Sequence, residues 1–190
     1  MDGDAALAKL MQGNRRYVSA AESSPKPLAH QRVAVAKKQR PFAAIVACSD
    51  SRVAPELVFD RGLGDLFVIR IAGNVVDSDA LGSLEYAVEH LGVRLVVVLG
   101  HQRCGAVEAT LTGGELGGHV RGLARAIEPA VKKARSLPGD PLEVAIQENA
   151  REMAAKIQTS KPALSQLAGG PVKIVAAEYS LDSGVVRILH

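Results

Sequence analysis

Four short runs of apolar residues, separated by segments with helical periodicity, limit most strongly what this chain can fold into. The runs cover residues 42–47, 66–69, 95–99 and 172–177. They do not alternate with polar residues, which is typical of strands buried on both faces. Strands that alternate with helices build a mostly parallel sheet. We therefore predict an α/β fold with a mostly parallel central sheet flanked by helices.

The helical segments have apolar residues three and four positions apart. Residues 79–90 repeat Leu81, Leu84 and Val88, and Gly92 follows as a residue that ends helices. The same spacing predicts helices over the segments 120–134, 142–157, 4–20 and 28–38.

The last segment, 178–189, has the pattern of a hairpin that turns at residues 182–184. The length of 190 residues fits one domain, and no repeat or low-complexity linker divides the chain. We expect a single domain over 1–190, with a helical N-terminal arm over 1–40 and an α/β core over 41–190.

Composition excludes several classes of partner. Hydrophobic residues make up 47% and charged residues 23%, which is typical of a folded domain. The net charge of +3 is small, and aromatic residues at 3% offer few stacking surfaces, so nucleic acid is not expected. No apolar run is long enough to span a membrane, and the first residues do not resemble a signal peptide. We expect a cytoplasmic protein with reduced cysteines.

Both cysteines of the chain lie in polar clusters that directly follow apolar runs. Cys48 opens Cys-Ser-Asp-Ser-Arg after the first run, and Cys104 closes His-Gln-Arg-Cys after the third. Ligands of parallel sheets bind beyond the carboxyl ends of the strands, so the two clusters are expected to meet there. Two thiolates, an imidazole and a carboxylate form a ligand set that zinc prefers. The candidate metal ligands are Cys48, Asp50, His101 and Cys104.

The fourth ligand decides what such a site does. Asp50 and Arg52 stand two residues apart, so both side chains can point the same way from an extended loop. An arginine fork binds a carboxylate through two hydrogen bonds. A carboxylate engaged by Arg52 would leave a position on zinc open for water, as in catalytic sites.

Other interpretations of these residues stay open at this point. The cysteines could be buried small apolar residues or, less readily in a reducing compartment, a disulfide. A closed structural site with Asp50 on zinc fits the ligand count nearly as well. Asp50 and Arg52 could also be a helix cap and a surface ion pair.

The two motifs resemble those of the β-class carbonic anhydrases. The resemblance covers nearly the whole chain. It runs through Cys48-Ser-Asp-Ser-Arg-Val, Gly64-Asp-Leu-Phe-Val, Arg70-Ile-Ala-Gly-Asn74, Gly82-Ser-Leu-Glu-Tyr-Ala-Val88 and Leu99-Gly-His-Gln-Arg-Cys-Gly105.

This resemblance implies an enzyme that reversibly hydrates CO2 to bicarbonate and a proton, with zinc-bound hydroxide as the nucleophile. Cys48, His101 and Cys104 would bind Zn2+. Asp50 and Arg52 would form a dyad that frees or occupies the fourth zinc position. The implied fold has an antiparallel strand at one edge of the parallel sheet. The implied assembly is a homodimer with exchanged N-terminal helices, or a dimer of dimers.

One branch of the family orients CO2 with a glutamine nine residues before the first cysteine, which is Gln39 here. Phe67 and Tyr86 match the apolar residues that line the substrate site, often across the dimer interface, and Gly105 is also expected there. A second branch closes its site with the aspartate and binds bicarbonate at a separate inhibitory position. Gln39 favours the open branch. The alternatives are a carbonyl sulfide or carbon disulfide hydrolase on the same site, and a non-catalytic zinc protein that serves assembly.

Overall fold

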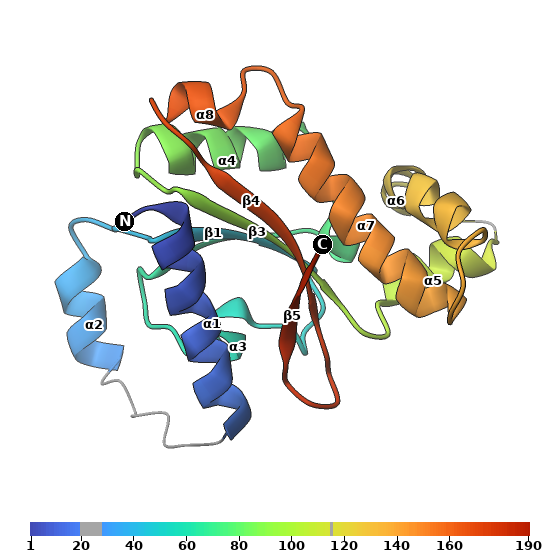
Figure 1. The fold of residues 1–190 in the computed structure, drawn as a ribbon, viewed down its shortest axis with the longest axis horizontal. Coiled ribbons are helices and arrows are strands. Elements are labelled where there is room, and N and C mark those ends of the chain that lie inside the picture. Colours follow the sequence, from blue (N-terminus) through green and yellow to red (C-terminus); the bar gives the residue numbers. More distant parts are fainter. Residues whose placement is uncertain (20–27, 115) are drawn as a thin grey trace.

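A five-stranded sheet with the strand order β2-β1-β3-β4-β5 forms the centre of the molecule (Figure 1). The computed structural model describes residues 1–19, 28–114 and 116–190. Strands β1 to β4 are parallel, and β5 pairs antiparallel with β4 at one edge. The predicted α/β fold is therefore confirmed, including the terminal hairpin. The strands are β1 (Ala43–Ala47), β2 (Leu66–Arg70), β3 (Leu95–His101), β4 (Lys173–Tyr179) and β5 (Val186–Leu189).

The helices confirm all five helical segments expected from periodicity; the segment 120–134 keeps its expected bounds, and the ends of the other four are shifted. The second of them stops at Val35 instead of continuing to residue 38, and residues 20–27 of the expected arm lie outside the described residues. Three short helices were not predicted: α3, α5 and α8. The helices are α1 (Gly3–Ser19), α2 (Leu28–Val35), α3 (Pro55–Val58), α4 (Ser78–Glu89), α5 (Gly105–Thr112), α6 (Val120–Ala134), α7 (Pro141–Gln158) and α8 (Leu164–Leu167), with a 3-10 turn, η1 (Ala72–Asn74).

Helices cover both faces of the sheet, which explains why the central strands β1 and β3 are buried and almost entirely apolar. Side chains alternate along a strand. Val96 and Val98 of β3 therefore pack with α4, α7 and α8, while Leu95 and Leu99 pack with α1 and the segment around α3. All seven residues of β3 are buried.

The N-terminal arm packs against the core of its own chain through α1. Leu10 is fully buried, and the Asn14 side chain lies almost fully buried at 3% exposure. Asn14 donates hydrogen bonds to the carbonyl oxygens of Val58 and Gly184 at 3.0 and 2.8 Å and accepts one from the Val186 amide at 2.9 Å. One side chain thus joins α1 to α3 and to the β4–β5 hairpin. Exchange of this arm between subunits stays a prediction.

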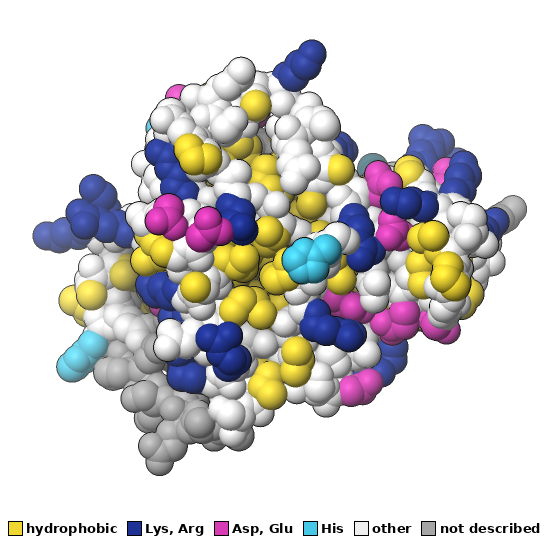
Figure 2. All heavy atoms as spheres, in the orientation of Figure 1, with side chains coloured by type: hydrophobic (Ala, Val, Ile, Leu, Met, Phe, Trp, Pro, Cys, Tyr) yellow, Lys and Arg dark blue, Asp and Glu magenta, His cyan; other side chains and the backbone are white. Residues whose placement is uncertain are grey.

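Figure 2 shows apolar side chains at the surface over β4 and β5, between α1 and α7. Ile174, Ile188 and Leu189 line a groove there, with Lys173 and Arg151 at its border. None of the site residues predicted from the sequence lines this groove. The two cysteine motifs lie elsewhere, at the carboxyl ends of β1 and β3.

Candidate metal centre

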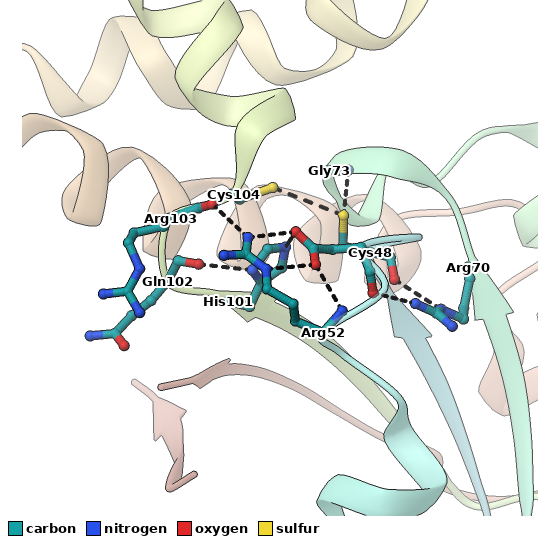
Figure 3. Close-up of polar contacts among 9 residues, drawn as sticks. Cys48, Arg52, Arg70, Gly73, His101, Gln102, Arg103 and Cys104 are labelled. Carbon is teal, nitrogen blue, oxygen red and sulfur yellow. Dashed lines mark hydrogen bonds and ion pairs between the residues drawn. The ribbon is translucent and has the colours of Figure 1, made fainter. Parts of the chain in front are cut away.

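Strands β1 and β3 bring the two cysteine motifs together at one edge of the sheet. Ala47, the last residue of β1, lies opposite Leu99 of β3, so Cys48 and His101 leave the sheet side by side. Cys104 immediately precedes α5 and points back toward Cys48 (Figure 3). The ligand atoms of Cys48, His101 and Cys104 all lie within 4.8 Å of one another, and all three residues are buried. The predicted convergence is confirmed.

The spacing of these atoms fits zinc. The two sulfur atoms are 4.0 Å apart. Two thiolates bound tetrahedrally at the usual zinc–sulfur distance of about 2.3 Å would lie about 3.8 Å apart. A disulfide is not formed, since both cysteines are free. The donor set and its spacing are those of a zinc site.

The imidazole of His101 has the tautomer that a metal ligand needs. Its Nδ1 lies 2.9 Å from the backbone carbonyl oxygen of Gln102, and because a carbonyl only accepts, Nδ1 carries the proton and donates it. Nε2 therefore keeps its lone pair. Nε2 is fully buried without a hydrogen-bond partner, which is costly unless a ligand binds it.

The two thiols share negative charge unequally. The hydrogen bond between the two sulfur atoms, in which either thiol can donate, lowers the pKa of Cys48 to about 4, with smaller contributions from His101 and from the Gly73 amide, although burial opposes the shift. The same interaction, together with burial, raises the pKa of Cys104. The first backbone amides of α5, those of Ala106 and Val107, lower it in part. A divalent cation held between the sulfurs would favour two thiolates.

Asp50 and Arg52 form a two-pronged ion pair beside the three ligands. Arg52 Nε and Nη2 donate to Oδ1 and Oδ2 of Asp50 at 2.9 and 2.7 Å, and the Arg52 amide donates to Oδ1 at 3.0 Å. These bonds hold the pKa of Asp50 well below its usual range, so the group is a carboxylate. Asp50 Oδ2 lies 3.9 Å from His101 Nε2, so the carboxylate borders the cluster while Arg52 engages it.

Arg70 is a site residue that the sequence analysis missed. Its Nε donates to the carbonyl oxygen of Cys48 at 3.0 Å and its Nη2 to that of Asp50 at 2.6 Å. Arg70 ends β2, opposite Ala47 in the parallel register. The sequence did contain a signal for Arg70, because this residue is basic and ends the apolar run 66–69, the strand next to the one that precedes Cys48.

The predicted substrate residues are only partly at this centre. Gly105 follows Cys104 directly, as the first residue of α5. Gln39 and Tyr86 instead line a separate surface groove of about 840 Å³ that contains none of the metal ligands. The Phe67 ring lies 6.2 Å from the Tyr86 ring, measured between centroids. Within one chain, Gln39, Phe67 and Tyr86 are therefore grouped with one another and not with the cysteines.

Comparison with known proteins now decides the family. A family model described as carbonic anhydrase matches residues 43–186, which contain every predicted metal ligand. The solved structure of the β-carbonic anhydrase CcaA is 30% identical, covers 97% of this chain and 95% of its own, and has a TM-score of 0.73. The chain belongs to the β-carbonic anhydrase family.

Other members of the family are similar over almost their full length. Carbonic anhydrase 2 of Mycobacterium tuberculosis is 43% identical over 185 residues, which cover 95% of this chain and 89% of the relative. The carbonic anhydrase of Mycolicibacterium smegmatis is 40% identical, with 97% and 92% covered. The Coccomyxa β-carbonic anhydrase solved with acetazolamide is 25% identical, with 96% and 86% covered and a TM-score of 0.75. Among the described helices of this chain, none is long and apolar enough to cross a membrane.

Proposed function

We propose that this chain catalyses the reversible hydration of CO2 to bicarbonate and a proton at a zinc ion held by Cys48, His101 and Cys104. The observation that carries the proposal is a buried three-ligand cluster beside a carboxylate that an arginine already engages. Zinc with an open position lowers the pKa of water and so supplies a hydroxide nucleophile near neutral pH.

The role proposed for Asp50 follows from its hydrogen bonds. Both of its oxygens accept from Arg52, and its lowered pKa keeps it ionised, so it can accept a hydrogen bond but cannot donate one. Arg52 in turn engages both oxygens and would hold the carboxylate beside the three ligands but off the metal. Asp50 Oδ2 is only 3.9 Å from His101 Nε2, so a small rotation would let a released carboxylate reach the metal position.

Stopped-flow CO2 hydration by the zinc-loaded protein tests the activity. A parallel assay of sulfide release from carbonyl sulfide separates the proposal from the sulfide-forming alternative. We expect hydration of CO2 to exceed sulfide release. A protein that binds zinc and hydrates no CO2 would instead support a role in assembly.

Arg52→Ala tests the dyad. We expect this variant to keep its zinc and to lose activity by about 100-fold or more, because the freed Asp50 carboxylate would occupy the position that water needs. Zinc content by elemental analysis and CO2 hydration by stopped flow are measured on the same sample.

Arg103→Ala is the matched control. Arg103 makes a similar two-pronged pair with Asp182, at 3.0 and 2.7 Å, near the same edge of the sheet. This control removes an arginine of the same kind without releasing Asp50, so it should keep most of the activity. Undiminished turnover in Arg52→Ala would refute the role given to Arg52.

A dimer would complete the substrate site in this proposal. Gln39 and Tyr86 line a groove on the surface of one chain, and Tyr86 is 48% exposed. A second copy docked on this groove would place these residues beside its own metal centre. Two β-carbonic anhydrases of Sordaria macrospora that share this fold are tetrameric, so we extend the proposal to a dimer of dimers. We also propose the cytoplasm as the compartment of this chain, because reducing conditions keep both thiols available.

A further inference from the structure

The turn that follows β2 carries a hydrogen bond to one of the metal ligands. The amide of Gly73, in the middle of η1, donates to the Sγ of Cys48 at 3.2 Å (Figure 3). Hydrogen bonds of this kind to a thiolate withdraw part of its charge and fix the direction of its lone pairs. The position of the Gly73 backbone therefore bears on how Cys48 can bind a metal.

Glycine is favoured at this position. Gly73 has φ 69°, in the left-handed region, and a Cβ added there would lie 2.6 Å from Cδ1 of Ile127. Asn74, the next residue, also has a positive φ of 43°. A turn with two such residues needs contacts that hold its conformation.

Helix α7 contacts this segment of the chain from one face, and one of its contacts reaches the turn itself. The fully buried Asn149 donates from Nδ2 to the carbonyl oxygen of Gly73 at 2.7 Å. Met153, one turn further along, accepts from the Val76 amide at 3.3 Å, and Lys156 donates to the Val76 carbonyl at 2.5 Å. These three residues stand at the i, i+4 and i+7 positions of one helix stripe. Of the three, only Asn149 bonds the residue that bonds Cys48.

We propose that Asn149 is a positioning residue for the metal centre, acting through the Gly73 backbone on the Cys48 sulfur. The Asn149 amide holds the carbonyl group of Gly73, in the peptide unit that follows the Gly73 Cα, and so restricts the rotation of that residue, whose N–H in the preceding peptide unit points at Cys48. The inference rests on zinc binding at Cys48 under the proposed function. It adds Asn149, which lies about a hundred positions after Cys48 in the chain, to the residues that support the metal centre. Outer-shell partners of this kind typically change metal affinity by about 10- to 100-fold when they are removed.

Asn149→Leu, which keeps the approximate size and removes the donor, tests the proposal. We expect zinc affinity, measured by competition with a chelator, to fall by about 10- to 100-fold. The cobalt-substituted variant should also show shifted sulfur-to-cobalt charge-transfer bands, since the Cys48 sulfur would lose its aligned amide. If the leucine variant does not fold, the same measurements are made on Asn149→Ser, which has a smaller polar side chain.

Met153→Leu is the matched control, because it removes a contact to the same segment from the same helix face without touching Gly73. It should leave zinc affinity and the cobalt spectrum close to those of the wild type. A second measurement needs no variant: NMR of the cadmium-loaded wild type should show a coupling between the metal and the Gly73 amide proton through the N–H···S bond.

The possible results distinguish the role proposed for Asn149 from the proposed zinc-dependent hydration of CO2. Asn149 variants with wild-type zinc affinity and an unchanged cobalt spectrum would overturn the inference, even if they lose thermal stability. Absence of the cadmium–Gly73 coupling would overturn it as well. Unchanged affinity together with normal CO2 hydration by the wild type would leave the proposed function intact. A wild-type chain that binds no zinc would overturn both.

Discussion

At the scale of single residues, Glu178 of β4 is the most unusual acidic group away from the metal centre. Its side chain is only 2% exposed, and it accepts a hydrogen bond from Gln147 at 3.1 Å. The Arg187 guanidinium lies 3.8 Å from its carboxyl group. Burial is the largest cause that raises the pKa of Glu178 to about 7, and the neighbouring Glu143 carboxyl group is the second. The folded protein therefore binds a proton that the unfolded chain releases at lower pH.

This shift predicts how the stability of the protein depends on pH. The pKa of Glu178 is higher in the folded state than the ordinary value of about 4.3, so its contribution to stability is lost as pH rises from about 4.3 to about 7. Glu178→Gln keeps a neutral side chain at all pH values. We expect the variant to be more stable than the wild type by about 1–2 kcal/mol at about pH 8, and nearly equal to it at about pH 4.

Urea unfolding of both proteins at the two pH values measures this difference. Glu128→Gln is the control, since Glu128 is half exposed and its ion pair with Lys132 lowers its pKa. A Glu178→Gln effect that is the same at both pH values would contradict the assignment.

The residues of the metal centre were predictable because each stands in a short motif directly after a strand. Cys48, Asp50, Arg52, His101 and Cys104 all lie within a few residues of the ends of β1 and β3. Asn149 has no such motif: it is a buried polar residue within the apolar stripe of a long helix, and its partner is a backbone carbonyl. The role that we propose for it follows only from its three-dimensional contact with Gly73.

At the scale of secondary structure, Asn14 ties the N-terminal helix to the rest of the chain. Asn14→Ala would leave two carbonyl groups and one amide without their partner, at positions where little water can replace it. We expect a loss of about 2–4 kcal/mol in the free energy of unfolding. Chemical denaturation measures the loss, and Gln12→Ala, an exposed position on the same helix, is the control. A change below about 0.5 kcal/mol, as at ordinary surface sites, would contradict the role of Asn14.

The strands could be predicted more reliably than the short helices. Burial on both faces gives β1 and β3 continuous apolar runs, which the sequence displays directly. Helices α3 and α8 have four residues each, too few to establish a helical period. The eight residues of α5 make only about two turns, with Glu108 and Thr112 on the exposed side and Val107 alone fully buried, so the segment is too short for periodicity to reveal it. It begins at Gly105, directly after Cys104, and packs against α6.

At the scale of the whole molecule, the separation of Gln39, Phe67 and Tyr86 from the metal centre predicts that activity depends on a dimer. Tyr86→Glu places a charge in the groove that a second copy would cover. We expect a monomer in analytical ultracentrifugation and a fall of at least about tenfold in kcat/KM, because the partner residues would no longer reach the site.

Val120→Glu is the control for this variant. Val120 begins α6 and is 51% exposed, close to the exposure of Tyr86, but it does not line the Gln39 groove. It should leave the assembly and the activity as in the wild type. A fully active monomeric Tyr86→Glu variant would refute the dimer-dependent site.

In the proposed site, three side chains bind zinc while Arg52 keeps Asp50 off the metal. A crystal structure of the zinc-loaded protein above neutral pH, with the metal located by its anomalous scattering, tests this arrangement. We expect zinc bound by Cys48, His101 and Cys104 with solvent as the fourth ligand and Asp50 still paired with Arg52. A zinc ion bound by the Asp50 carboxylate, or bound away from these three residues, would contradict it.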